Sequence, residues 1–232
     1  MSENWIDYWS KKNIWSSSTL WHKNSIILYN YSQKKFLLKN KRILDIGCGS
    51  GELIEKVLND TKFIYGVDIS KNYVSICKKK FSQHKNIKIK LFKKNYKSLN
   101  KLNKKFDVIF CNSVVQYFTN ETQIIELIRS VKKVSTKGTK FLISDIMDKN
   151  ENKDYLKFIL YSFARGYFLS LIYQATILFL NPKQRKLEND YKLLEIDTKK
   201  IKNKINKLCK KSVIIEEPIT INVNRKHLLM EF

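Results

Sequence analysis

The chain has 232 residues and a formal net charge of +24, with 45 Lys and Arg against 21 Asp and Glu. Hydrophobic residues make up 43%, and glycine and proline are scarce, which excludes a disordered or linker-like chain and predicts one domain with a sizeable core. The four cysteines show neither a CxxC pair nor a metal-ligand spacing, and the first 14 residues lack an apolar stretch of signal length. We therefore expect reduced thiols and a cytoplasmic location.

An aromatic-rich segment over residues 1–40 favours one or two helices before the first strand. The apolar run Arg42–Ile46 predicts a buried strand, and Glu52–Asn59 carries apolar residues at helical spacing. Phe63–Asp68 is typical of a second strand, and Tyr73–Phe81 of a second helix.

The same alternation continues toward the C-terminus. Lysines alternate with apolar residues along the third strand, Ile87–Phe92, which predicts a position near an edge of the sheet. The remaining predicted elements are a strand at Phe106–Cys111, a helix at Glu121–Val134, a turn at Lys137–Thr139, a strand at Lys140–Ile146, a Lys-rich helix at Leu193–Cys209 and closing strands at Ser212–Ile215 and His227–Phe232. Strands that alternate with helices predict an α/β fold, with a parallel sheet and helices on both faces.

After the fifth strand, Tyr155–Leu180 is apolar and is interrupted at Arg165 and Gly166. Its last 14 residues carry no charge, which falls short of the ~20 residues that a membrane span needs. A buried cap or dimer helix is favoured here, with membrane-surface contact and a span as alternatives. The predicted organisation is a lid segment over 1–40 and a domain over 41–232, which includes an apolar helical cap insertion at 150–190.

A glycine-rich loop, Gly47-Cys48-Gly49-Ser50-Gly51, directly follows the first strand and opens a helix. Such a loop can approach a phosphate or a nucleoside-linked group closely, because glycine carries no Cβ and the helix offers free N–H groups. Asp68 follows about 20 positions later at the end of the second strand, where an acid binds ribose hydroxyls. Nicotinamide sites use GxGxxG, whereas the spacing here is GxGxG. Asp45, just before the loop, would repel a pyrophosphate but suits a cofactor with a cationic end.

With Asp45 included, the loop has the form (D/E)xGxGxG and resembles motif I of the class I S-adenosylmethionine-dependent methyltransferases. The resemblance covers about residues 41–146 and extends more loosely to the C-terminus. It implies a Rossmann-like, seven-stranded, mostly parallel sheet with an N-terminal helical lid and a helical insertion after the fifth strand. It also implies S-adenosylmethionine as cofactor and S-adenosylhomocysteine as product.

The resemblance carries the family's cofactor contacts over by position. The glycines would lie under the methionine part, Asp45 at its amino end, Asp68 on the ribose and Ile69 on the adenine. Asn95 stands where the family often has an Asp that bonds the adenine amino group. The implied cofactor-binding residues are Asp45, Gly47, Cys48, Gly49, Gly51, Asp68, Ile69, Asn95, Tyr96, Cys111 and Asn112.

Candidate groups on the acceptor side are few. His22, in the aromatic segment, is a candidate base or substrate contact. The segment after the fourth strand faces the methyl group in this family, which makes Gln116 and Tyr117 candidate substrate contacts. Some quinone-type O-methyltransferases place an acid and a His at these two positions and use them with a metal. This chain lacks both, so no metal is expected. The segment also lacks the Pro-Pro signature of enzymes that methylate base amino groups.

The first hypothesis is therefore O-methylation of a small, anionic molecule, such as a nucleotide-linked sugar, a phosphorylated metabolite or a glycan precursor. One alternative is an RNA or DNA methyltransferase that uses the twelve lysines between Lys78 and Lys105, although a solvated face in a lysine-biased chain explains them too. Others are a non-catalytic cofactor-binding module and an enzyme that contacts a membrane through residues 155–180. The chain is expected to be a monomer or a homodimer.

Overall fold

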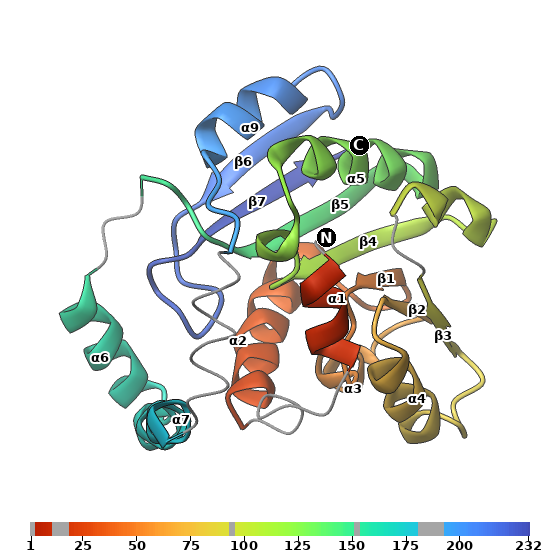
Figure 1. The fold of residues 1–232 in the computed structure, drawn as a ribbon. Helices are drawn as coiled ribbons and strands as arrows, with labels where there is room; N and C mark the ends of the chain where they lie inside the picture. The colour runs from red at the N-terminus through yellow and green to blue at the C-terminus, as the bar shows by residue number, and fades with distance from the viewer. Residues whose placement is uncertain (1–2, 11–18, 93–95, 151–153, 181–192) are drawn as a thin grey trace.

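The computed structural model describes residues 3–10, 19–92, 96–150, 154–180 and 193–232 (Figure 1). A seven-stranded sheet of order β3-β2-β1-β4-β5-β7-β6 forms the centre. Its strands are β1 (Arg42–Ile46), β2 (Phe63–Asp68), β3 (Ile87–Leu91), β4 (Phe106–Asn112), β5 (Ser135–Ile146), β6 (Lys211–Ile215) and β7 (Lys226–Glu231). Among the described strands, β7 runs in the direction opposite to the other six, so the predicted mostly parallel sheet is confirmed, as is the edge position of β3.

Helices cover both faces of this sheet. One face carries α2 (Thr19–Phe36), α3 (Glu52–Val57) and α4 (Lys71–Lys80), and the other carries the 3-10 helix η2 (Tyr96–Leu102), α5 (Glu121–Val134) and α9 (Thr198–Ile205). Side chains of β4 alternate between the two cores: Phe110 packs with Phe36 of α2, whereas Ile109 lies in the core formed with α5. The core therefore continues from α2 into the sheet.

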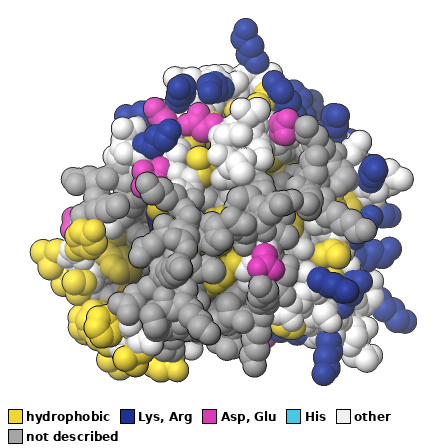
Figure 2. All heavy atoms as spheres, in the orientation of Figure 1, with side chains coloured by type: hydrophobic (Ala, Val, Ile, Leu, Met, Phe, Trp, Pro, Cys, Tyr) yellow, Lys and Arg dark blue, Asp and Glu magenta, His cyan; other side chains and the backbone are white. Residues whose placement is uncertain are grey.

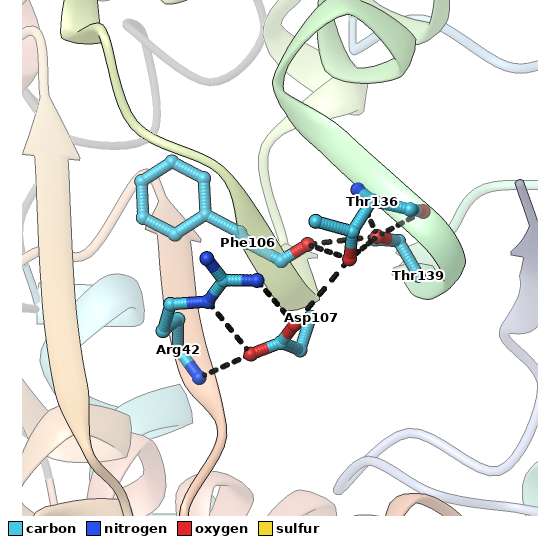
Figure 3. A network of polar contacts seen from close by, with 5 residues as sticks. All are labelled: Arg42, Phe106, Asp107, Thr136 and Thr139. Carbon is cyan, nitrogen blue, oxygen red and sulfur yellow. Dashed lines mark hydrogen bonds and ion pairs between the residues drawn. The ribbon is translucent and has the colours of Figure 1, made fainter.

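The amino ends of β1, β4 and β5 are joined by a polar network (Figure 3). Arg42 donates from Nε and a terminal guanidinium nitrogen to Asp107 at 3.0 and 2.7 Å, and its backbone N–H donates to the same carboxylate at 2.9 Å. This charge-assisted pair lowers the pKa of Asp107 to about 2. The Thr139 hydroxyl donates to the Phe106 carbonyl oxygen at 2.7 Å and accepts from the Thr136 N–H. The network therefore fixes the end of the sheet that lies away from the glycine-rich loop.

The predicted turn at 137–139 lies inside β5 instead of before it. Ser135 already pairs with Phe106, and Lys140 pairs with Val108, so the residues between them bulge out of the ladder. Gly138, with φ +84°, supplies the left-handed backbone of this bulge. The expected start of the strand at Lys140 was therefore five residues too late.

The Lys-rich helix was predicted too long at both ends. The structure confines α9 to Thr198–Ile205, and the Asp197 side chain caps its start by accepting from the Lys200 N–H at 2.9 Å. The preceding backbone is extended instead, because Leu194 donates to the Gln116 carbonyl oxygen and Ile196 donates to Met147. These long-range bonds override the helical pattern of residues 193–197.

The apolar segment after β5 forms two helices, α6 (Tyr155–Ala164) and α7 (Phe168–Leu180), separated at Gly166 with φ +70°. They lie beside α2 at one flank of the molecule (Figure 1). Within the described residues, no helix combines the length and the hydropathy that crossing a membrane requires.

Candidate active site

The glycine-rich loop turns at the carboxyl end of β1, in the middle of the sheet. Gly47 has φ +76° and donates its N–H to the Val67 carbonyl oxygen at 2.8 Å. A Cβ on Gly47 would lie 2.3 Å from a methyl carbon of Val114, so no other residue fits between the loop and the segment after β4. The loop thus brings β1, β2 and β4 together at one edge.

Asp68 ends β2 and lies directly against this loop. Its two carboxylate oxygens accept from the backbone N–H groups of Gly49 at 2.9 Å and Ser70 at 2.8 Å. Burial raises the pKa of Asp68, although the backbone N–H groups of Ser70, Gly49 and Ile69 partly oppose the rise. A carboxylate has about four lone-pair sites, so Asp68 retains capacity to accept from a hydroxyl group.

Asp45 lies beneath the loop and is almost fully buried, with 4% of its surface exposed. Burial raises its pKa from 3.8 to about 7, and the charges of Asp68 and Glu52 act in the same direction. Three acidic groups in one sheltered place make the local potential negative. The arrangement favours a ligand that carries positive charge.

These groups line a cleft of about 830 Å³, including its open mouth. Aromatic residues cover it: the Trp9 ring of α1 (Glu3–Ser10) lies 5.4 Å from that of Tyr117 and 6.1 Å from that of Tyr73, between ring centroids. The Ser70 hydroxyl donates to the Trp9 carbonyl oxygen and so ties α1 to the start of α4. The part of the predicted lid that reaches the cleft is therefore α1, together with Trp21 of α2.

Most of the predicted site residues come together here. The cleft is lined by Asp45, Gly47, Cys48, Gly49, Asp68, Ile69, Asn112 and Tyr117. Gly51, Cys111 and Gln116 are buried next to it and are absent from its described lining. Asn95 lies outside the described residues, and Tyr96 begins η2.

The candidate base His22 does not line the cleft. It is exposed, whereas its neighbours on α2, Trp21 and Ser25, line the cleft. At 100° per residue, His22 falls on the same side of α2 as Tyr29, whose hydroxyl donates to Asp60 at 2.7 Å. That side faces solvent and the end of α3.

A second polar cluster lies behind Asn112 and Ser113, which form part of the cleft wall. The Ser113 hydroxyl donates to Asp145 Oδ2 at 2.7 Å, and the Arg225 Nε lies 3.3 Å from Asp145 Oδ1. The Asp145 N–H donates to Nδ1 of His227 at 3.1 Å. Burial lowers the pKa of His227 to about 3, with help from the neighbouring cations, so its imidazole is neutral.

The backbone around this cluster is unusual. Ser113 has φ +55° and Asp145 has φ +64°, in the left-handed region that non-glycine residues seldom adopt. Such strain is typical of functional sites, where the surrounding fold holds it in place. Sequence reasoning missed this cluster because its members lie just after β4, in β5 and at the start of β7, and no local pattern connects them.

The comparisons with known proteins agree with this geometry. A family profile described as "Methyltransferase domain" matches residues 37–195. The chain belongs to the class I S-adenosylmethionine-dependent methyltransferases. The magnesium protoporphyrin IX methyltransferase of Synechocystis, solved with S-adenosylhomocysteine, shares the fold at a TM-score of 0.59 and 14% identity, over 99% of this chain and 93% of that one.

Two curated relatives are similar over shorter stretches. The ubiquinone biosynthesis O-methyltransferase of Coxiella burnetii is 26% identical over 105 residues, 45% of this chain and 44% of that protein. Carboxy-S-adenosyl-L-methionine synthase 1 of Yersinia pseudotuberculosis is 26% identical over 132 residues, 52% of each. The chain thus spans about half the length of the curated relatives that it matches. The methyltransferase family, the fold and the cofactor class predicted from the glycine motif are confirmed.

The cleft of this methyltransferase fits its family's cofactor. S-adenosylmethionine carries a cationic sulfonium, an ammonium group and two ribose hydroxyls. Asp45 and Glu52 would supply negative charge for the cations, and Asp68 would accept hydrogen bonds from the ribose hydroxyls. When bound, the cofactor would supply an electrophilic methyl group.

Proposed function

We propose that this protein transfers the methyl group of S-adenosylmethionine to an oxygen atom of a small, anionic molecule. The observation that carries the proposal is the Asp145–Ser113 pair behind the cleft wall. Methylation of a hydroxyl group must remove its proton, and a positioned base typically contributes 10²- to 10⁴-fold to such a step.

Ser113 and Asp145 can together take up that proton. The acceptor hydroxyl gives its proton to the Ser113 oxygen while the Ser113 hydroxyl proton moves to Asp145 Oδ2, along the hydrogen bond of 2.7 Å. Arg225, at 3.3 Å, keeps the carboxylate in place. Burial, reinforced by the charge of Asp145, raises the pKa of Tyr117, so its phenol stays protonated and can donate to an acceptor oxygen.

The anionic character of the acceptor rests on the field of the whole chain. A formal net charge of +24 attracts anions and repels cations at long range. The acidic groups that line the cleft cluster at the cofactor loop. Arg225 lies behind the cleft wall and is paired with Asp145, so this pair adds no net positive charge to the site. The preference for an anionic acceptor therefore depends on the long-range field of the chain.

The test is a screen of acceptors with S-adenosylhomocysteine release as the readout. We expect turnover with one or more hydroxyl compounds that carry phosphate or carboxylate, and none with their amine analogues. Asp145→Asn and Ser113→Ala should each lower kcat by at least tenfold with little change in cofactor affinity, whereas Ser75→Ala, at an exposed position of α4, should not. Tight cofactor binding without turnover on any acceptor would favour a binding module instead.

A nucleic-acid substrate is the second candidate, because exposed lysines gather along α4 and β3. Lys78, Lys79, Lys80, Lys88 and Lys90 are all exposed there. RNA binding through this face would weaken steeply with salt. Replacing any lysine that binds a phosphate would reduce the slope of log affinity against log salt concentration by about one unit. Filter binding of a short single-stranded RNA between 50 and 300 mM KCl therefore separates the two candidates. The nucleic-acid substrate would be favoured by micromolar affinity at low salt together with methyl incorporation into the RNA.

A further inference from the structure

The outer surface of α6 and α7 is unusually apolar. Figure 2 shows hydrophobic side chains gathered over these two helices, at the lower left of the molecule. The large apolar residues exposed here are Tyr155, Leu156, Ile159, Leu160 and Phe163 of α6 and Leu169, Ile172, Tyr173, Phe179 and Leu180 of α7. In each helix these positions fall on one side, so each presents a continuous apolar stripe to the outside. We call these ten residues the outer stripe.

The opposite sides of the two helices are anchored to the body of the protein. The Tyr167 hydroxyl donates to the Ile221 carbonyl oxygen at 2.6 Å, and its buried ring packs with Leu20 and Ile27 of α2. The Tyr161 hydroxyl donates to the Pro218 carbonyl oxygen at 3.2 Å. The outer stripe is therefore a surface held in a fixed orientation.

This surface does not serve the cleft. In the part of the chain that the structure describes, no residue of α6 or α7 lines it. Monomeric soluble proteins rarely expose contiguous apolar patches beyond a few hundred Å², and larger ones mark an interaction surface. The ten exposed apolar residues therefore mark the outer stripe as an interaction surface.

Charge decides between the candidate partners. From Tyr155 to Leu180 the chain has no carboxylate, and its charged residues are Lys157 and Arg165, both exposed. A second copy would also carry a net charge of +24, so two copies repel each other. A surface of anionic lipid instead attracts the chain, and it accepts apolar side chains at the same time.

We propose that the outer stripe docks the protein on an anionic phospholipid membrane, with α6 and α7 lying in the plane of the interface. The helices have 10 and 13 residues, whereas a span needs about 20, so they lie on the bilayer and do not cross it. Arg165 stacks on the Tyr161 ring, with its guanidinium carbon 5.0 Å from the ring centroid. Because Tyr161 belongs to the anchored side of α6, Arg165 adds to the long-range attraction of anionic lipid while the apolar stripes enter the acyl boundary. This inference does not rest on the proposed function.

The test is cosedimentation of the full chain with vesicles. We expect binding to vesicles of phosphatidylcholine with 30% phosphatidylglycerol, and at least tenfold weaker binding to phosphatidylcholine alone. Leu169→Glu should weaken binding by roughly tenfold or more, because a Leu side chain is then removed from the interface. The matched control is Leu37→Glu, which makes the same change at a similarly exposed Leu, 74% against 79%, away from the outer stripe.

Thermal unfolding and S-adenosylhomocysteine binding would confirm that both variants are folded. The proposal fails if the folded wild type sediments with neither vesicle, or if the two variants lose binding equally. It also fails if the wild type is a dimer at micromolar concentration that Leu169→Glu dissociates, because the outer stripe then joins two copies. Equal binding to neutral and anionic vesicles would contradict its electrostatic part.

Discussion

Replacing Asp45 by asparagine should make the free protein more stable and the cofactor site weaker. The pKa of Asp45 is raised from 3.8 to about 7, mainly by burial. Each pKa unit corresponds to about 1.4 kcal/mol, so ionising this carboxyl in the folded protein costs about 4 kcal/mol more than in the unfolded chain. Asparagine has the shape of the protonated acid and carries no such cost.

The sign of the pH dependence follows from the direction of that pKa change. A raised pKa favours the folded state while the group is protonated, so this stabilisation is complete below about pH 4 and is lost as the pH rises to about 7. The unfolding free energy of Asp45→Asn should therefore exceed that of the wild type by an amount that grows by about 3 kcal/mol between pH 5 and pH 8.

Urea unfolding followed by tryptophan fluorescence, without cofactor, measures this difference at each pH. Titration calorimetry with S-adenosylmethionine should show that the same variant binds about tenfold or more weakly, because a charged hydrogen-bond acceptor is removed. A stability difference that stays constant with pH would refute the assignment of the raised pKa to Asp45. Unchanged affinity would refute its contact with the cationic end of the cofactor.

Three further variants test other parts of the structure. Gly51→Ala should lower the unfolding free energy by about 1–3 kcal/mol in urea unfolding and weaken cofactor binding in calorimetry. The reason is that Gly51 has φ +90° and an added Cβ would lie 2.5 Å from Phe81. Asp107→Asn should lower the unfolding free energy by about 1–3 kcal/mol at pH 7. It should leave S-adenosylhomocysteine affinity unchanged, because the pair with Arg42 lies at the other end of the sheet. The difference in unfolding free energy should shrink from pH 4 toward pH 2, because Asp107 of the wild type, with a pKa of about 2, becomes protonated there. Tyr117→Phe should lower kcat/KM about tenfold on the acceptor found by the screen, with the same pH profile between 6 and 9 as the wild type, since its phenol is already protonated there.

The fold and the cofactor loop could be predicted because their signals are local. Asp45 and the glycines lie within seven residues, and the loop geometry depends on backbone conformations that only glycine adopts easily. The alternation of apolar runs with helical periods was enough to order the elements, since parallel strands must be joined by crossovers. Asp68 was found for the same reason, because it ends the next strand.

The polar cluster behind the cleft wall could not be predicted, because it is made by contacts between distant segments. Ser113, Asp145 and Arg225 are separated by at least 30 positions in the sequence. Asp145 nevertheless lies 2.7 Å from the Ser113 hydroxyl and 3.3 Å from Arg225 Nε. On α2, the polar residues Asn24 and Ser25 are buried. The buried face of this helix is therefore not marked by apolar residues alone, and the sequence pattern did not show that His22 faces solvent. Burial of polar groups is a tertiary property, and a single sequence does not display it.

The orientation of α2 explains how the cleft and the outer stripe can work separately. Leu20 and Ile27 face the apolar helices, whereas Trp21 and Ser25, about 100° around the axis, face the cleft. Docking of α6 and α7 on a membrane would therefore leave the cleft entrance clear, since no described residue of these helices lines it. Loss of vesicle binding in Leu169→Glu should consequently leave cofactor affinity intact, and loss of cofactor affinity in Asp45→Asn should leave vesicle binding intact. If either variant lost both, α2 would have to couple the two sites.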